Sequence, residues 1–254
     1  MMKTGVFTGL VLLTFSLTAV ADVEKTEEMN FDVNPGARIS LENVNGDIKI
    51  SGDSADGVHV VAHKKAGTKE YLDGMEIAVD ATGDYVRIET RHPKGDGSWF
   101  SWAKDSSGSI AYELSVPADV NLDSIVTVNG DVTVRSVDGK VKVSTVNGSI
   151  DADGLSSVVD LETVNGGIAA DFETLGDDQR VSAEAVNGKI VLNLPANASA
   201  RIDAETVNGS IDAEDFGLEP EKGFVGRDLN GDIGGGDARI SVNTVNGSIR
   251  IVKK

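Results

Sequence analysis

Acidic side chains recur at fixed places in the second half of the chain and are the first candidates for chemistry. When the sequence is aligned on a repeated Asn-Gly, they fall into three columns: Glu162, Glu184 and Glu205; Asp160 and Asp203; Asp151 and Asp212. If the repeats stack as successive strands, the three glutamates lie at strand spacing, where like charges cost free energy unless they are screened or neutralised. Such an acidic stripe can recruit Ca²⁺ or a cationic partner. The alternative is a solvated face that keeps a repeat protein soluble and blocks sideways aggregation.

A second candidate is aromatic. Trp99, Phe100 and Trp102 lie together between two strand-like runs, and they include both tryptophans of the chain. If these rings are exposed, they form an apolar patch that can stack on sugar rings or anchor a protein partner. If they fold back, they plug the end of the repeat array. We regard this segment as the best single candidate for a binding site.

Catalytic constellations are not evident. His59, His63 and His92 lie in no catalytic motif, and the chain has no cysteine for thiol chemistry. His59 and His63 are four residues apart on a predicted strand and so share a face, where they can ligate a metal or be ordinary, partly exposed strand residues. We therefore predict no catalytic residues, no enzymatic activity, no resident metal and no cofactor, with Ca²⁺ as the one cation considered.

The elements that position these side chains follow from a tripeptide repeat, Val-Asn-Gly or Leu-Asn-Gly. Its flanks repeat as well, as in STVNGSIDA, ETVNGSIDA and NTVNGSIRI, and each unit alternates apolar and polar residues as half-buried strands do. Asn-Gly accommodates positive φ at low cost and is typical of sharp corners. The predicted corner asparagines are Asn45, Asn129, Asn147, Asn165, Asn187, Asn208, Asn230 and Asn246.

Two architectures fit this pattern, an antiparallel meander with Asn-Gly hairpins and a parallel β-solenoid with one corner per coil. We favour the solenoid because a near-constant period with one repeated corner suits stacked coils, and because stacked asparagines can form a hydrogen-bonded ladder. The predicted fold is all-β, a right-handed parallel β-solenoid (β-helix) of about seven coils over residues 117–254. Residues 22–116 are predicted to form a broader β-sheet region that caps it, with a first repeat unit over 39–50.

The first 21 residues read as an export signal, with Lys3 before a short apolar run and Ala19-Val20-Ala21 as a cleavage site. The alternative is a buried N-terminal helix. Such a signal predicts that the mature chain is exported to the periplasm, to the outside of the cell or to the cell surface. No second apolar run is long enough to span a membrane, and there is no cysteine at the cleavage site for lipid attachment.

Charge and composition agree with this interpretation. The formal net charge of −18 argues against nucleic acid as a partner, because phosphate binding needs clustered Lys and Arg. Aromatic residues make up only 5% of the chain. Thin coils that bury small aliphatic residues explain why so few are needed.

The order SLENVNGDIKI, YVRIETRHP, YELSVPADVNL and then serial TVNGSI units resembles the bacterial putative-adhesin family of unknown function, also called the toastrack domain. It is also similar to the head domains of auto-transporter adhesins. The resemblance implies a β-solenoid in exported or membrane-associated proteins, some of them linked to envelope stress signalling. It supplies no catalytic or binding residues. Many relatives are tethered by a transmembrane segment, and this chain departs from them because none follows its signal.

Together these features predict an exported, non-enzymatic repeat protein of the bacterial cell envelope. We expect an adhesin-like or scaffold module whose partner is a protein or glycan of that envelope. A glycan-active parallel β-helix enzyme and a calcium-stabilised structural repeat protein are the alternatives.

Overall fold

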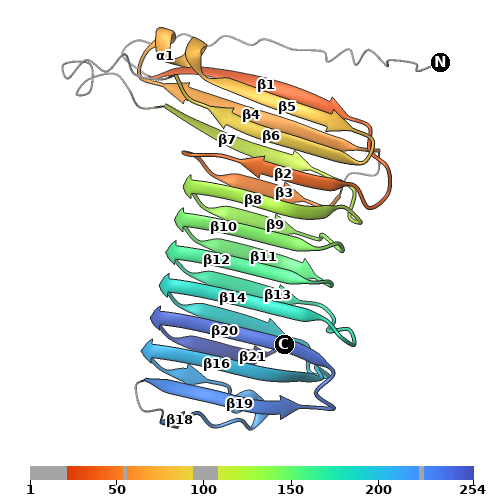
Figure 1. The fold of residues 1–254 in the computed structure, drawn as a ribbon, viewed down its shortest axis with the longest axis vertical. Coiled ribbons are helices and arrows are strands. Elements are labelled where there is room, and N and C mark those ends of the chain that lie inside the picture. Colours follow the sequence, from red (N-terminus) through yellow and green to blue (C-terminus); the bar gives the residue numbers. More distant parts are fainter. Residues whose placement is uncertain (1–21, 54–55, 94–107, 223–225) are drawn as a thin grey trace.

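The computed structural model describes residues 22–53, 56–93, 108–222 and 226–254. The predicted signal peptide over 1–21 and the aromatic segment with Trp99, Phe100 and Trp102 lie outside these ranges. Its regular secondary structure is almost entirely β-strand (Figure 1).

The N-terminal part contains seven strands and one short helix within its described residues: β1 (Val23–Phe31), β2 (Arg38–Glu42), β3 (Ile48–Ser51), β4 (Val58–Ala66), α1 (Lys69–Gly74), β5 (Glu76–Thr82), β6 (Tyr85–Arg91) and β7 (Gly108–Ser115). The repeats from residue 121 onward begin with β8 (Asn121–Asn129), β9 (Val132–Arg135), β10 (Val141–Asn147), β11 (Ile150–Leu155), β12 (Val159–Asn165), β13 (Ile168–Phe172), β14 (Arg180–Asn187) and β15 (Ile190–Leu194). They end with β16 (Ala200–Asn208), β17 (Ile211–Asp212), the 3-10 helix η2 (Glu214–Phe216), β18 (Glu221–Lys222), β19 (Arg227–Ile233), β20 (Ala238–Asn246) and β21 (Ile249–Lys253).

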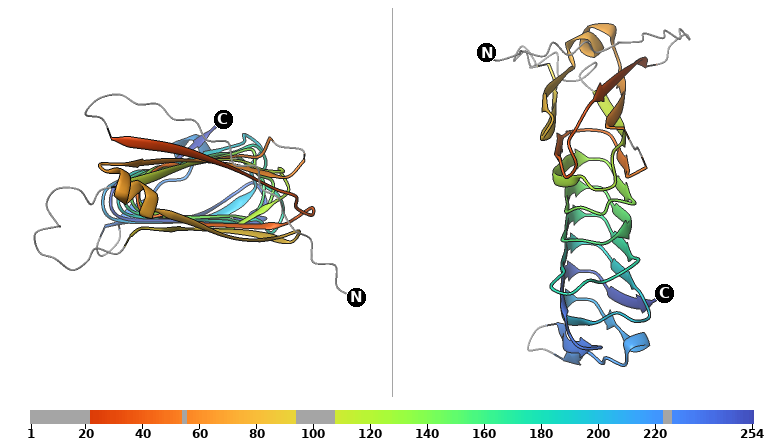
Figure 2. Two further views of the ribbon diagram at one scale, coloured as in Figure 1. Left: turned by 90° about the horizontal axis from the view of Figure 1, so that it is seen from above. Right: turned by 90° about the vertical axis from the view of Figure 1, so that its right-hand side faces the viewer.

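The strands form two sheets that face each other along the whole molecule (Figure 2). Over the described residues, sheet A has ten strands in the order β1-β4-β7-β3-β9-β11-β13-β15-β21-β17. Sheet B has eleven, in the order β18-β19-β16-β20-β14-β12-β10-β8-β2-β6-β5. Each repeat contributes one strand to each sheet and turns the Asn-Gly corner between them, and successive repeats pair in parallel, with Asn147 beside Asn165. The parallel β-solenoid is therefore confirmed, and the antiparallel meander is wrong for the repeats.

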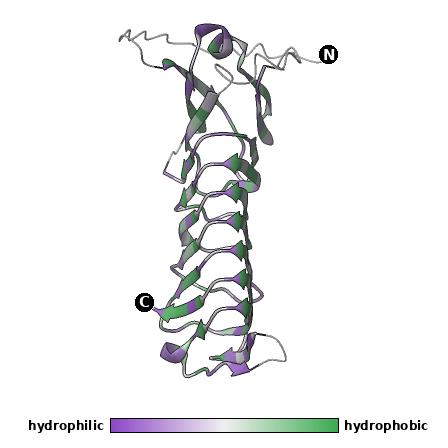
Figure 3. Ribbon diagram, turned by 90° about the vertical axis from the view of Figure 1, so that its left-hand side faces the viewer, coloured by the Kyte–Doolittle hydropathy of each residue, from purple (hydrophilic) through white to green (hydrophobic). Residues whose placement is uncertain are grey.

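The core is a column of small aliphatic side chains between the sheets. Each repeat strand alternates buried and exposed residues; β12, for example, buries Val159, Leu161 and Thr163. Hydrophobic residues recur at corresponding places from coil to coil (Figure 3). Tyr112 and Phe172 are the largest fully buried side chains among the described residues. Burial of this kind contributes about 25 cal/mol per Å² of apolar surface, which holds the coils together without disulfides.

The N-terminal region extends both sheets beyond the regular coils, as predicted. The first repeat unit, β2 and β3, stacks directly on β8 and β9, so Gly46 lies beside Gly130 although 84 residues separate them. The intervening chain adds β7 to sheet A and β6 to sheet B in parallel, and then β4 and β5 in antiparallel pairing. Strand β1, which precedes the first repeat unit, pairs antiparallel with β4 at the edge of sheet A. The sheets splay apart at this end, where α1 lies (Figure 2).

The C-terminal coil lies inside the stack. Strand β20 pairs with β14 on one side and with β16 on the other, and β21 lies in the same way between β15 and β17. The C-terminus therefore lies between coils (Figure 1). Six units from residue 117 onward form two-stranded parallel coils in the described chain, where we predicted about seven.

The unit around Asn230 accounts for the difference. This residue lies in the middle of β19, which pairs antiparallel with β16 and covers its edge. The prediction that Asn230 forms a corner is wrong, because the flanking residues continue as a single strand.

Candidate binding face of the solenoid

The repeated Thr-Val-Asn-Gly gives each corner four different contacts. In the coil of β12, Thr163 is buried and Val164 is exposed. Asn165 bonds to the neighbouring coils, and Gly166 packs against the corner of the preceding coil at Gly148. The threonine hydroxyl donates a hydrogen bond to the glycine carbonyl oxygen of the preceding coil, at 2.8 Å for Thr163 and Gly148. The sequence repeat is therefore a repeat of contacts between coils.

The predicted asparagine ladder is present. From the second member onward, each Nδ2 donates to the Oδ1 of the preceding asparagine at 2.8 or 2.9 Å, over the series Asn45, Asn129, Asn147, Asn165, Asn187, Asn246 and Asn208. Seven of the eight predicted corner asparagines belong to it, and Asn230 does not. The order of the last two members again shows that the C-terminal coil is inserted.

The corner glycines are needed for a reason other than the predicted positive φ. Only Gly46, with φ 124°, and Gly166, with φ 157°, have a positive φ among these corners. A Cβ added at Gly148 would lie 2.0 Å from the carbonyl oxygen of Gly130, and one added at Gly188 would lie 1.7 Å from that of Gly166. Close approach of stacked backbones therefore excludes any side chain.

The valines of the repeat form an exposed column on sheet B. Their side chains point outward because the residue before each of them, a threonine in most units, points inward. Six of them are among the exposed large hydrophobic residues of the described chain, between 38% and 44% exposed: Val44, Val146, Val164, Val186, Val207 and Val245. Val128 occupies the same column and is half-buried. A continuous row of exposed apolar side chains is typical of interaction surfaces.

The glutamate column runs beside the valines, two residues earlier on each strand. Glu162 and Glu184 are direct register partners on β12 and β14. We predicted that Glu205 lies next to Glu184, and this is wrong. Asn243 of the inserted β20 lies between the two glutamates. Ser144 on β10 completes the column on the other side of Glu162.

The two aspartate columns are interrupted in a similar way. Asp160 pairs with Lys142 at 2.7 Å, whereas Asp203 lies beyond Ser182 and Ser241 in the same column. The hydrogen bond and charge of Asp160, with a contribution from Glu162, raise the pKa of Lys142. This lysine is thus committed to Asp160.

On sheet A, Asp151 and Asp212 are separated by three strands and so form no continuous stripe. The intervening positions are Ala169, Val191 and Arg250. Asp212 is paired with Arg250 at 3.2 Å. Of the predicted acidic columns, the glutamates alone place two carboxylates on adjacent strands.

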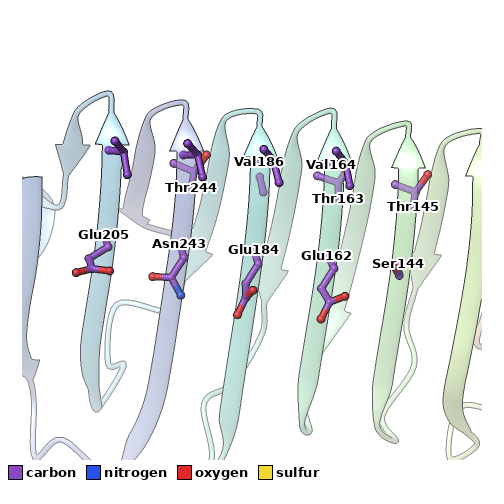
Figure 4. Close-up of a pocket in the computed structure, with 13 residues that line it drawn as sticks. Ser144, Thr145, Glu162, Thr163, Val164, Glu184, Val186, Glu205, Asn243 and Thr244 are labelled. Atoms are coloured by element: carbon purple, nitrogen blue, oxygen red, sulfur yellow. The ribbon is translucent and has the colours of Figure 1, made fainter. Parts of the chain in front are cut away.

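A groove lies between the valine and glutamate columns across five strands, β10, β12, β14, β20 and β16 (Figure 4). We call it the valine–glutamate groove. Its volume is about 380 Å³, and it is lined by Ser144, Thr145, Glu162, Thr163, Val164, Glu184, Ala185, Val186, Glu205, Val207, Asn243, Thr244 and Val245. One wall is acidic and polar, the other is apolar, and the floor is formed around the buried threonine positions.

Comparison with protein families agrees with the repeat and its corners. The family model Toastrack DUF4097 matches residues 101–252, more than half of the chain. The chain belongs to the toastrack family. The predicted resemblance to the putative-adhesin (toastrack) family of unknown function is therefore confirmed.

Solved structures include similar chains, and one of them, with a TM-score above 0.5, shares this fold. A "putative cell adhesion protein" from Clostridium sporogenes is 18% identical with a TM-score of 0.52, and the match covers 91% of this chain and 100% of that one. A "putative adhesin" from Bacteroides fragilis is 13% identical with a TM-score of 0.44, covering 90% of this chain and 97% of that one. A search of curated proteins gave no match.

Other predicted site residues of the toastrack chain are not gathered into a site. His59 bonds to Asn30 through Nδ1 at 2.7 Å, and His63 bonds to Thr26 at 3.1 Å. No group of three or more His, Cys, Asp or Glu side chains that could hold a metal ion occurs in the described ranges. None of the helices in those ranges is long and apolar enough to cross a membrane.

The valine column is the candidate binding feature that the sequence interpretation missed. Its signal was present in the toastrack repeat itself. Period-two alternation that buries Ile202 and Ala204 also buries Thr206, and so turns Val207 outward. An apolar residue repeated at an outward position is a signal for a candidate contact surface rather than for the core.

Proposed function

We propose that this toastrack protein is an exported, non-enzymatic module of the bacterial cell envelope that binds a protein or glycan partner through the valine–glutamate face of sheet B. In this proposal residues 1–21 direct export, and residues 22–116 and 117–254 are the capping region and the solenoid. The role is adhesin-like or that of a scaffold.

The observation that carries the proposal is the exposed valine column on an otherwise acidic protein. Valine contributes nothing to solubility at these positions, and a chain with a net charge of −18 has many polar alternatives for an outward strand position. A flat row of apolar side chains beside carboxylates provides both buried area and charge selectivity to an interface. The name of the C. sporogenes protein of similar fold is in keeping with this role.

The test is a pull-down from envelope fractions with the full mature chain as bait. We compare the wild type with Val164→Thr/Val186→Thr, which keeps side-chain shape and removes apolar surface from the groove wall. The matched control is Val79→Thr/Val158→Thr, since these valines have similar exposure, 36% and 37%, but lie elsewhere. We expect a partner that is recovered with the wild type and the control and lost with the groove variant.

Equal recovery with all three baits would contradict the proposal, and so would release of product from a glycan panel by the purified protein. Export is tested separately by cell fractionation and by N-terminal sequencing of the mature protein, which we expect to begin at Asp22. Retention of residues 1–21 on a cytoplasmic protein would contradict the export part.

A further inference from the structure

The carboxylates of the valine–glutamate groove are positioned to gain from a cation. Glu162 and Glu184 are direct neighbours on strands about 4.8 Å apart, where like charges repel. Within the described chain, Glu162, Glu184 and Glu205 form no hydrogen bond or ion pair through their side chains; the nearby Lys142 is bonded to Asp160. A basic ligand would relieve this repulsion.

The groove is directional, because its two walls differ. All glutamates lie on one side of the floor and all valines on the other (Figure 4). A chain that lies along the floor, across the strands, presents one side to carboxylates and the other to methyl groups. In an extended polypeptide successive side chains point to opposite sides, so such a segment meets both walls when basic and apolar residues alternate.

The spacing of the charges fits the same geometry. Glu162 and Glu205 are three strand intervals apart, or about 14 Å at 4.8 Å per strand. Three alternate residues of an extended chain span about 13 Å at 3.3 Å per residue. A bound segment of this length therefore reaches from Glu162 to Glu205 and passes over Asn243.

We propose that the valine–glutamate groove binds an extended polypeptide segment of about six residues in which basic and apolar side chains alternate, lying along the solenoid axis with its basic side chains toward Glu162, Glu184 and Glu205. The inference rests on the proposed function and names the chemistry of the partner. The floor strands already use their backbone groups in the sheet, so recognition depends on side chains. Affinity for a single short segment is accordingly modest, and selectivity comes from the alternation.

The experiment measures binding of two fluorescently labelled synthetic hexapeptides of identical composition to the full mature chain. One alternates Lys and Leu, and the other carries three Lys followed by three Leu. We expect the alternating peptide to bind at a 1:1 ratio and at least about fivefold more tightly than its isomer, because only alternation satisfies both walls. Equal affinities would overturn the proposal, since general attraction to an acidic protein does not depend on order.

Variants locate the peptide. Glu162→Gln/Glu184→Gln is expected to weaken binding roughly tenfold, the loss of two solvent-exposed ion pairs. Asp153→Asn/Asp177→Asn removes the same charge from exposed positions outside the groove and is expected to change affinity less than about twofold. An equal loss in both variants, or no loss in the first, would overturn the proposal. Thermal melts verify that each variant is folded.

The outcome separates this inference from the proposed function. If the alternating peptide does not bind while an envelope partner is still lost with Val164→Thr/Val186→Thr, the ligand chemistry is wrong and the interaction function stands. If neither the peptide nor any partner depends on the groove, both are wrong.

Discussion

The hydroxyl of Thr163 donates a hydrogen bond to the carbonyl oxygen of Gly148 in the preceding coil, at 2.8 Å. Thr145, Thr206 and Thr244 make the same bond to the glycines of their neighbouring coils. The coil of β14 has Ala185 at this position, so the carbonyl of Gly166 lacks this bond.

Replacing Ala185 with Thr should therefore stabilise the protein. The new hydroxyl would reach the Gly166 carbonyl as its counterparts do, a hydrogen bond worth about 0.5–1.5 kcal/mol of the free energy of unfolding. Urea unfolding of the full chain measures the change. The converse, Thr163→Val, keeps the shape and should cost about 1 kcal/mol; a gain from Thr163→Val or a loss from Ala185→Thr would contradict the role assigned to these hydroxyls.

The stacked corners make a strong prediction for glycine. Gly188→Ala should destabilise the solenoid by more than about 3 kcal/mol, because the added methyl carbon meets the Gly166 carbonyl oxygen and the coils must separate. Thermal unfolding monitored by circular dichroism measures this loss. Gly67→Ala is the control, since an added Cβ there meets nothing within 4 Å. Equal melting temperatures for the two variants would show that the corners tolerate side chains.

Asn165 tests the ladder. It donates to Asn147 and accepts from Asn187, both at 2.9 Å, so Asn165→Ala removes two hydrogen bonds at once. We expect a loss of about 1–2 kcal/mol in the free energy of unfolding by urea. Asn230→Ala is the matched control, because the same Leu-Asn-Gly motif there lies within β19 and outside the ladder. A loss at Asn230 as large as at Asn165 would mean that the ladder adds nothing specific.

These contacts explain how much of the structure could be predicted from the sequence. The repeat fixed the period, the corner and the inward residues, and parallel stacking with an asparagine ladder follows from them. The order in which the coils stack cannot be predicted in this way, because the repeats are nearly alike. Asn208 and Asn246 lie in nearly identical repeats, so the local sequence does not show which of them stacks on Asn187. In the structure it is Asn246. The same ambiguity misplaced Glu205 beside Glu184 in the predicted acidic stripe.

The motif at residues 229–231 shows a second limit. Leu-Asn-Gly forms a corner only when the chain on each side enters a different sheet. In β19 the flanking residues pair with β16 along their whole length, from Arg227 to Ile233, and the tripeptide continues as strand. A corner is therefore a property of the stack as much as of the three residues.

The N-terminal region gives a prediction for pH. Lys64 is 5% exposed and donates to Glu27 at 3.0 Å and to the carbonyl of Met75 at 2.9 Å. Burial alone would raise the pKa of Glu27, but hydrogen bonds from Lys25 and Lys64 hold it below its ordinary value of 4.5. A carboxylate with a lowered pKa stabilises the fold above pH 4.5, and this contribution is lost as the pH falls through the folded-state value.

Glu27→Gln should accordingly lower the free energy of unfolding at pH 7 by about 1 kcal/mol, allowing for solvent screening of the partly exposed pair. The difference from the wild type should shrink as the pH falls below 4.5. Urea unfolding at pH 7, 5 and 3 measures it. Glu28→Gln, at an exposed position on the same strand, should show no such convergence. If the difference between the wild type and Glu27→Gln stays constant across this range, the stabilising effect of Glu27 does not depend on its ionisation and the prediction is wrong.

The inserted C-terminal coil can be tested by disulfide formation, and the absence of native cysteine makes the test clean. Ser182 and Ser241 are register partners on adjacent strands, whereas Ser182 and Asp203 are separated by β20. Adjacent strands lie about 4.8 Å apart, within the range for a disulfide, and alternate strands about 10 Å apart, outside it. Under mild oxidation Ser182→Cys/Ser241→Cys should form an intramolecular bridge, while Ser182→Cys/Asp203→Cys should keep free thiols or link separate molecules. Thiol counting and non-reducing electrophoresis distinguish these outcomes, and the reverse pattern would place β16 directly on β14, with the coils in the order of the chain.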